Sequence, residues 1–195
     1  MKQIHTLLAV IFLYSITVTA QTTARLSPVA AELFKGVKSL ISVNEKNFIA
    51  QQTGFILSGN KEQPFALDKD SKEYPFGITL LPTDLNKDGK EEIFIGFGNT
   101  YTSGNTGSSI ALFIKNAAGV YEMNFGFPGM LPDVLTTANK GYPDLVVGGP
   151  GFEFPVFRWN GKVYDNYKTM SDAVYGKTKM MSAEELSKLY QKTVK

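Results

Sequence analysis

Hydrophobic residues change their spacing along this chain, from a helical period near the start to strand-like runs in the middle and back to a helical period at the end. Behind Ser27-Pro28, apolar residues recur every three or four positions, which predicts an amphipathic helix over 28–41. A second, shorter helix is expected over 45–52, capped by Asn44 and ended by Gly54. Together these two patterns predict an N-terminal helical segment over 28–52.

The remaining pattern predicts strands and one closing helix. Apolar runs at 55–57 and 65–67 flank a polar turn, as in a hairpin. From residue 78 onward, short β-branched and aromatic runs alternate with Gly, Asn and Pro. Near the end, Ser182 and Glu185 form a capping-box pattern that opens a helix over 183–193. The fold class we expect is mainly β (α+β), with antiparallel hairpins between terminal helices.

The middle of the chain contains a degenerate duplication, at about 78–125 and 132–167. Each copy enters a short apolar strand that ends in Gly, at 93–96 in the first copy and at 145–148 in the second. Each copy then continues into a hairpin, and the Asn160-Gly161 turn of the second is the strongest short hairpin signal. The two copies predict blade-like hairpins.

The spacing of the two copies locates an insertion. Glu92 and Asp144 correspond and lie 52 residues apart, within the range of repeat proteins. From Glu92 to the hairpin turn at Asn116 there are 24 positions, whereas from Asp144 to Asn160 there are 16. The 8 extra residues of the first copy fall in the polar, Gly-rich loop 99–109, which carries Tyr101. Long loops on rigid scaffolds often bind partners, although a plain mobile loop is equally compatible with this composition.

An acidic loop precedes the strand of the first copy. Asp84, Asn86 and Asp88 alternate and are followed by Gly89, which matches positions 1, 3, 5 and 6 of a calcium-binding loop. The carbonyl of Lys90 and the carboxylate of Glu92 would complete the oxygen ligands. An EF-hand is excluded, because Ile95 stands at its twelfth position and a strand follows. These residues predict one Ca²⁺ site, with ligands from Asp84, Asn86, Asp88, Lys90 and Glu92.

A metal-free interpretation of the same residues is also open. Asp84, Asn86 and Asp88 could cap backbone amides in a surface turn, with nearby lysines neutralising the acids. The second copy has Thr136, Ala138 and Lys140 at the corresponding positions. We therefore expect it to fold without metal, with the ammonium of Lys140 where the cation would sit and Asp144 capping the turn.

An acidic loop, a Gly, a further acid and a short apolar strand ending in Gly together resemble the FG-GAP/VCBS repeat of integrin-type β-propellers. The likeness rests on residues 84–92 before the strand at 93–96, and more weakly on Gly141 and Asp144 before 145–148. Glu92 departs from the Asp usual at that position. The resemblance implies a calcium-binding β-blade. Two copies are too few to close a propeller, so it implies no complete one. The chain also resembles small exported bacterial proteins.

Composition restricts the chemistry. The chain has 195 residues, a net charge of +2, no Cys and a single His, His5. Residues 1–20 have the charged start, apolar middle and small final residue of a signal peptide, so we expect residues 21–195 to form one exported domain, secreted or periplasmic, with no membrane span after cleavage. Loss of His5 excludes a Ser-His-Asp triad and a zinc site built on His or Cys. The small net charge argues against a nucleic-acid partner.

Three functions remain compatible with the sequence. The first is a non-enzymatic, calcium-stabilised module that binds a protein or carbohydrate through loop 99–109. The second is a glycan hydrolase that uses two carboxylates, for which Glu122, Asp133 and Glu153 are candidates. The third is a periplasmic inhibitor or immunity-type protein. The aromatic residues between 142 and 167 could stack on sugar rings, but small β-rich domains use such residues mostly in their cores.

Overall fold

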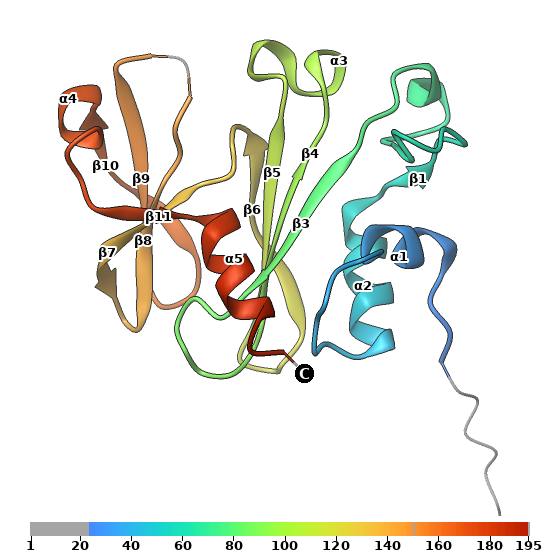
Figure 1. Cartoon of the computed structure of the whole chain (residues 1–195), viewed down its shortest axis with the longest axis horizontal. Coiled ribbons are helices and arrows are strands. Elements are labelled where there is room, and N and C mark those ends of the chain that lie inside the picture. Colours follow the sequence, from blue (N-terminus) through green and yellow to red (C-terminus); the bar gives the residue numbers. More distant parts are fainter. Residues whose placement is uncertain (1–23, 150, 195) are drawn as a thin grey trace, which may run out of the picture.

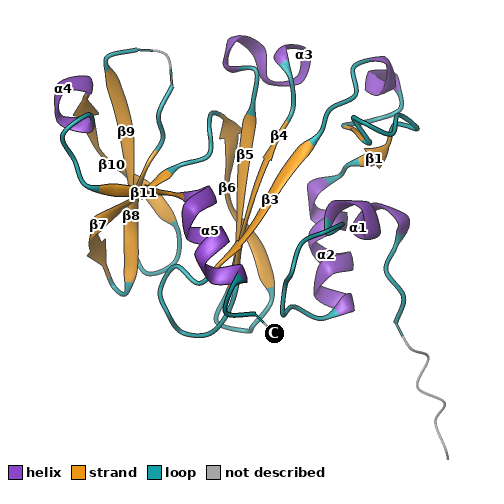
Figure 2. Ribbon diagram, viewed as in Figure 1, coloured by secondary structure: helices purple, strands orange, loops and turns teal. Residues whose placement is uncertain are grey.

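The structure is a computed structural model that describes residues 24–149 and 151–194, so the expected signal peptide at 1–20 lies outside the described residues. Two antiparallel sheets stand side by side, with the N-terminal helices on the far side of one sheet and helix α5 near their junction (Figures 1 and 2). The expected mainly-β fold is confirmed. Within the described residues the sheets close neither a barrel nor a complete propeller.

Each copy of the duplication forms a four-stranded meander. The four-stranded sheet has the order β3-β4-β5-β6, and the five-stranded sheet has the order β10-β9-β8-β7-β11. The strands of the first are β3 (Ile78–Thr83), β4 (Glu92–Phe97), β5 (Ser109–Lys115) and β6 (Tyr121–Pro128). The strands of the second are β7 (Asp133–Asn139), β8 (Tyr142–Val146), β9 (Glu153–Trp159), β10 (Tyr164–Ser171) and β11 (Met180–Ser182).

Strand registers show that the two sheets repeat the same pairing. Ile93 lies between Pro82 and Phe113 in the first sheet. Leu145, 52 positions later, lies between Val134 and Phe157 in the second. The eight-residue difference therefore lies between β4 and β5.

A hydrogen bond is repeated as well. The hydroxyl of Tyr121 donates to the carbonyl of Glu91 at 2.8 Å, and that of Tyr164 donates to the carbonyl of Pro143 at 2.8 Å. Glu91 and Pro143 are again 52 positions apart. The duplication thus extends from the sequence to the individual contacts that hold each meander together.

The two sheets pack in the same sense, so that corresponding residues face successive cores. Ile93 faces the N-terminal helices, whereas its counterpart Leu145 faces the first sheet. Phe94 faces the second sheet, whereas its counterpart Val146 lies on the outer side of that sheet. The central core between the sheets contains most of the aromatic residues of the second copy, including the buried Tyr142, Trp159 and Tyr164. For these three rings the core interpretation is confirmed.

The N-terminal segment is less helical than its pattern predicts. Helix α1 (Pro28–Leu33) ends eight residues before the predicted end, and Gly36 adopts a positive φ of 72°. The prediction of one helix over 28–41 was wrong, because the residues beyond Leu33 make long-range contacts in place of helical hydrogen bonds. The backbone N–H of Leu40 donates to Oε1 of the buried Glu91 at 2.6 Å.

Helix α2 (Val43–Thr53) forms, but Ser42 rather than Asn44 caps it, through a capping box with Glu45. Gly54 ends it in the left-handed conformation, as predicted. The short hairpin of β1 (Ile56–Leu57) and β2 (Phe65–Ala66) also agrees with the sequence pattern.

At the other end, α5 (Ala183–Gln191) begins with the predicted capping box of Ser182 and Glu185. Loop 99–109 is not irregular throughout, because it contains the helical turns α3 (Thr100–Ser103) and η2 (Gly104–Thr106). Two further short elements are η1 (Asp70–Glu73) and α4 (Asp172–Tyr175). Among the described helices, none combines the length and apolar character needed to cross a membrane.

Candidate metal centre

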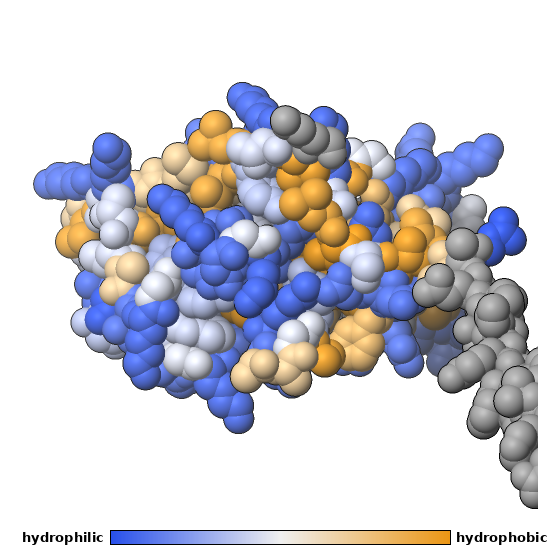
Figure 3. All heavy atoms as spheres, turned by 90° about the horizontal axis from the view of Figure 1, so that it is seen from below, coloured by the Kyte–Doolittle hydropathy of each residue, from blue (hydrophilic) through white to orange (hydrophobic). Residues whose placement is uncertain are grey.

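The acidic loop joins β3 to β4 at the lower end of the sheets, whereas α3 lies at the upper end (Figure 1). Thr83 closes the base of the loop, because its hydroxyl donates to the carbonyl of Glu92 at 3.0 Å. Seen from below, hydrophilic residues cover much of this face, with hydrophobic residues in several patches among them (Figure 3).

The alternating polar side chains bend the loop around themselves. Asp84 accepts the backbone N–H groups of Asp88 and Gly89 at 3.0 and 3.1 Å. Asn86 also accepts the N–H of Asp88, at 3.1 Å, and Asp88 accepts that of Lys90 at 2.9 Å. Gly89 has a φ of +81°, which the absence of a Cβ permits. The structure therefore brings Asp84, Asn86 and Asp88 together as the spacing predicts.

These contacts are those of an Asx-rich turn, and they do not form a closed cage of carboxylates. Within residues 24–149 and 151–194, no group of three or more His, Cys, Asp or Glu side chains is arranged to hold a metal ion. The side-chain amide of Asn86 and the backbone carbonyl of Lys90, which can also bind a cation, do not belong to these four kinds of side chain. A carboxylate oxygen carries more than one lone pair, so accepting an N–H leaves room for a cation. The ammonium of Lys90 lies 3.6 Å from Asp88 and is largely exposed.

Glu92 is the unusual member of the set. Its side chain is almost fully buried, with Oε2 accepting the N–H of Leu85 at 2.7 Å and Oε1 accepting the hydroxyl of Tyr142 at 2.9 Å. Burial raises the pKa of Glu92 from its ordinary value of 4.5 to about 7, and the negative charges of Asp88 and Asp84 act in the same direction. Among the described residues, no basic side chain forms an ion pair with it.

The corresponding acid of the second copy is neutralised. Arg158 donates to Asp144 from Nε at 2.9 Å and from Nη2 at 2.6 Å, and the hydroxyl of Thr137 donates at 2.6 Å. Burial alone would raise the pKa of Asp144, but the hydrogen bonds from Arg158 and Thr137 hold it below its usual value. The prediction that Asp144 caps the turn was therefore wrong. Lys140 does not reach it either, because its ammonium donates to the carbonyl of Asn160.

Arg158 has an apolar counterpart in the first copy. Phe113 of β5 pairs with Ile93, and Phe157 of β9 pairs with Leu145, the counterpart of Ile93, so Phe113 and Phe157 correspond. The residues that follow them, Ile114 and Arg158, therefore correspond as well. Ile114 is buried in the central core. The first copy thus keeps a buried acid and lacks the internal cation that the second copy provides. A charged residue aligned with an isoleucine was the sequence signal for this difference, and sequence reasoning missed it.

Sequence reasoning also missed Glu91. It is buried, and Oε1 accepts the N–H of Leu40 at 2.6 Å and the hydroxyl of Tyr190 at 3.1 Å, while Oε2 accepts the hydroxyl of Ser39. Glu91 therefore ties the acidic loop to the N-terminal segment and to α5. These partners are distant in sequence, so no local pattern could have identified the contact.

The predicted binding loop at the upper end is well fixed. Asn99 accepts the N–H groups of Tyr101 and Thr102 and donates to the carbonyls of Tyr74 and Pro75. The ring of Tyr101 stacks on that of Tyr74, with 3.6 Å between their centroids, and remains mostly exposed on its other side. The loop is therefore a shaped surface with an aromatic platform.

The three candidate hydrolase acids occupy different places. Glu122 lines a groove of about 840 Å³ at the lower end, together with Asn86, Asp88 and Lys90. Asp133 lines a cleft of about 780 Å³ between the sheets, together with Thr106 and Ser108 of the upper loop. Glu153 is exposed at the start of β9. The structure does not bring these acids into one site.

Comparison with known proteins adds no relative: the chain matches no family model, no curated protein and no solved structure.

Proposed function

We propose that this chain is an exported, non-enzymatic binding module of the FG-GAP/VCBS type, stabilised by Ca²⁺ at the loop 84–92. The observation that carries the proposal is the contrast between the two buried acids. Asp144 has the guanidinium of Arg158 beside it, whereas Glu92 has Ile114 at the corresponding position. A buried, charged carboxylate without a counter-charge is strongly unfavourable even when it is hydrogen-bonded, so the first copy favours a proton or an external cation at Glu92.

Calcium suits the groups available there. Hard cations take six to eight oxygen ligands, and Asp84, Asn86, Asp88 and Glu92 offer side-chain oxygens while Lys90 offers its carbonyl. A divalent ion would offset the mutual repulsion of the three acids and favour the charged form of Glu92. The ion would act on stability, because the loop also carries Glu91, which holds the two terminal segments.

Partner binding is assigned to the opposite end of the sheets. The fixed conformation of loop 99–109 reduces the ordering entropy lost on binding, and the outer face of Tyr101 can pack on a sugar ring or an apolar side chain. The partner is therefore a protein or a carbohydrate. Separation of Glu122 from Asp133 favours binding over glycan hydrolysis, which requires two acids about 5–9 Å apart.

The test of calcium stabilisation is thermal unfolding of the mature protein in Ca²⁺ and in chelator. Calcium at 100 times its dissociation constant should add about 2.7 kcal/mol to the free energy of unfolding. The variant Asp84→Asn/Asp88→Asn keeps acceptor oxygens for the turn but removes two charges, and it should lose the calcium response. Asp70→Asn, at an exposed acid remote from the loop, should keep it. Equal melting temperatures of the unsubstituted protein in the two buffers would refute the calcium site.

A further inference from the structure

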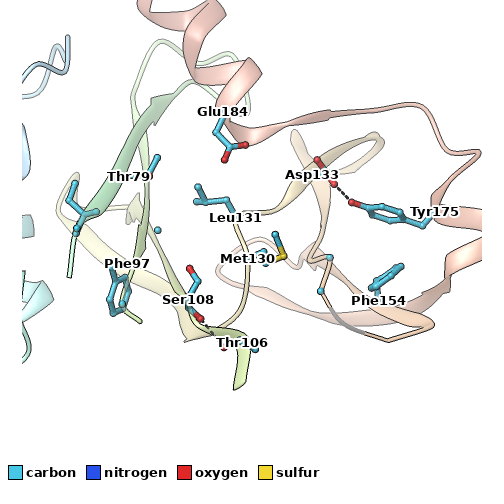
Figure 4. A pocket seen from close by; sticks show the side chains of 16 residues that line it. Thr79, Phe97, Thr106, Ser108, Met130, Leu131, Asp133, Phe154, Tyr175 and Glu184 are labelled. Carbon is cyan, nitrogen blue, oxygen red and sulfur yellow. Dashed lines mark hydrogen bonds between the residues drawn. The ribbon is translucent and has the colours of Figure 1, made fainter. Parts of the chain in front are cut away.

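The cleft between the two sheets has a chemical character that the calcium loop does not explain. It lies at the upper end, and corresponding residues of the two copies line it: Gly96 from the first and Gly148 from the second. Its volume of about 780 Å³ is within the usual range for ligand sites. Side chains from both sheets, from the loop before β5 and from α4 and α5 line it (Figure 4).

Two carboxylates give the cleft its charge. Asp133, at the start of β7, accepts the hydroxyl of Tyr175 on one oxygen, and no donor from residues 24–149 or 151–194 hydrogen-bonds its other oxygen. Glu184, in the first turn of α5, is half-buried and lies on the other side of Leu131 in Figure 4. Among the described residues that line the cleft, none is Lys or Arg. The cleft is therefore negative, without an internal counter-charge.

The walls beside these acids are apolar and partly aromatic. Phe97, Phe154 and the ring of Tyr175 line the cleft, together with Met130. Aromatic faces and carboxylates together favour a cation carried on an apolar stem, because the rings attract the charge and contact the stem. Along the same cleft, residues 77–79 include the first two residues of β3, which is an edge strand of its sheet and can offer backbone hydrogen bonds to an extended chain.

We propose that this cleft binds an extended peptide segment through a basic side chain, with Asp133 and Glu184 holding its guanidinium or ammonium. The inference rests on the proposed binding function and identifies its ligand as a basic peptide. It does not require the metal, because the acidic loop lies at the other end of the strands. Thr106 and Ser108 would contact the peptide from the loop that carries Tyr101.

The test is calorimetric titration of the mature protein with two blocked tripeptides, Gly-Arg-Gly and Gly-citrulline-Gly, which differ only in the charge of the central side chain. The arginine peptide should bind at least about tenfold more tightly. Asp133→Asn/Glu184→Gln should abolish that difference, since it removes both charges and leaves an acceptor for Tyr175. The control Glu122→Gln/Asp165→Asn removes two exposed charges outside the cleft and should retain it.

Equal affinity for the two peptides, absence of binding to either, or the same loss in both double variants would overturn the inference. Retained calcium stabilisation with no preference for arginine would refute the basic-peptide ligand alone. A preference for arginine that persists in a protein insensitive to chelator would instead refute the calcium proposal alone. Each variant is first checked for an unchanged melting temperature, and Asp133→Asn alone serves if the double variant does not fold.

Discussion

The hydroxyl of Tyr142 donates to Oε1 of Glu92 at 2.9 Å, across the boundary between the two sheets. Tyr142 begins β8 of the second copy, and Glu92 begins β4 of the first. The carboxylate that closes the acidic loop is thus held from both sides, by Leu85 of its own loop and by a ring of the neighbouring sheet. This contact couples the state of the loop to the packing of the central core.

Removing that donor should destabilise the protein. Tyr142→Phe keeps the ring in the core but leaves one oxygen of Glu92 without its protein donor, which should lower the free energy of unfolding by about 1–3 kcal/mol in urea titrations at pH 8. Tyr164→Phe is the matched control, because it loses a hydrogen bond to a neutral carbonyl. It should be less destabilising and leave calcium affinity unchanged, whereas Tyr142→Phe should alter that affinity. Identical effects of the two substitutions would argue against the coupling.

Stability in chelator should fall as the pH rises through the range in which Glu92 titrates. Because the pKa of Glu92 is raised from 4.5 to about 7 on folding, the folded state binds more protons than the unfolded state between these values. The contribution of this group, up to about 3 kcal/mol, is therefore present below pH 4.5 and is lost by pH 7 and above.

Glu92→Gln should flatten this part of the pH profile and make the chelated protein more stable than the unsubstituted one at pH 8. In calcium the order should reverse, since the substitution removes a charged ligand. Chemical unfolding from pH 4 to 9, in both buffers, measures both effects. A profile of the chelated, unsubstituted protein that does not decline between pH 5 and 7 would be incompatible with the buried, unneutralised carboxylate.

Arg158 should be far more important than a typical surface arginine. Arg158→Met keeps much of the aliphatic stem but removes the guanidinium, which lies over the ring of Tyr167 and pairs with Asp144. It leaves the Asp144 carboxylate buried without its counter-charge, so it should lower the free energy of unfolding by about 3–5 kcal/mol. The double variant Asp144→Asn/Arg158→Met should recover a substantial part of that loss. Chemical unfolding of the single and double variants measures the coupling. If the double variant were as unstable as Arg158→Met alone, the ion pair could not be the cause.

The sequence predicted most of what depends on local pattern. The paired hairpins, the capping box of α5 and the strand after the acidic loop all follow from turn residues and spacing within a few positions of one another. The helix predicted over 28–41 is too long, because its helical spacing competes with the long-range contact between Leu40 and Glu91. For the site, spacing predicted that Asp84, Asn86 and Asp88 converge. It could not predict that Arg158 neutralises Asp144, since this depends on the register of β8 against β9.

Gly98 should be required for the shape of the upper loop. Its φ is +97°, and a Cβ added there would collide with the hydroxyl oxygen of Ser103 and lie 2.9 Å from that of Thr102. Gly98→Ala should therefore destabilise by about 2–3 kcal/mol and disorder the turn that presents Tyr101. Gly104→Ala is the control, because φ is also positive there but no atom lies within 4 Å of the added Cβ. It should cost about 1 kcal/mol. Equal melting temperatures of the two variants would remove the steric argument.

Glu91 should hold the two ends of the chain against the acidic loop. Glu91→Ala removes the buried acceptor for Ser39, Leu40 and Tyr190 and should lower the free energy of unfolding by about 3 kcal/mol. Hydrogen exchange should accelerate at the backbone amide of Leu40 and in α5, while the amides of β8 and β9 change less. Glu73→Ala, at an exposed acid, is the control and should alter neither region. Uniform acceleration over both sheets would mean that Glu91 supports the whole core and does not act as a specific tether of the terminal segments.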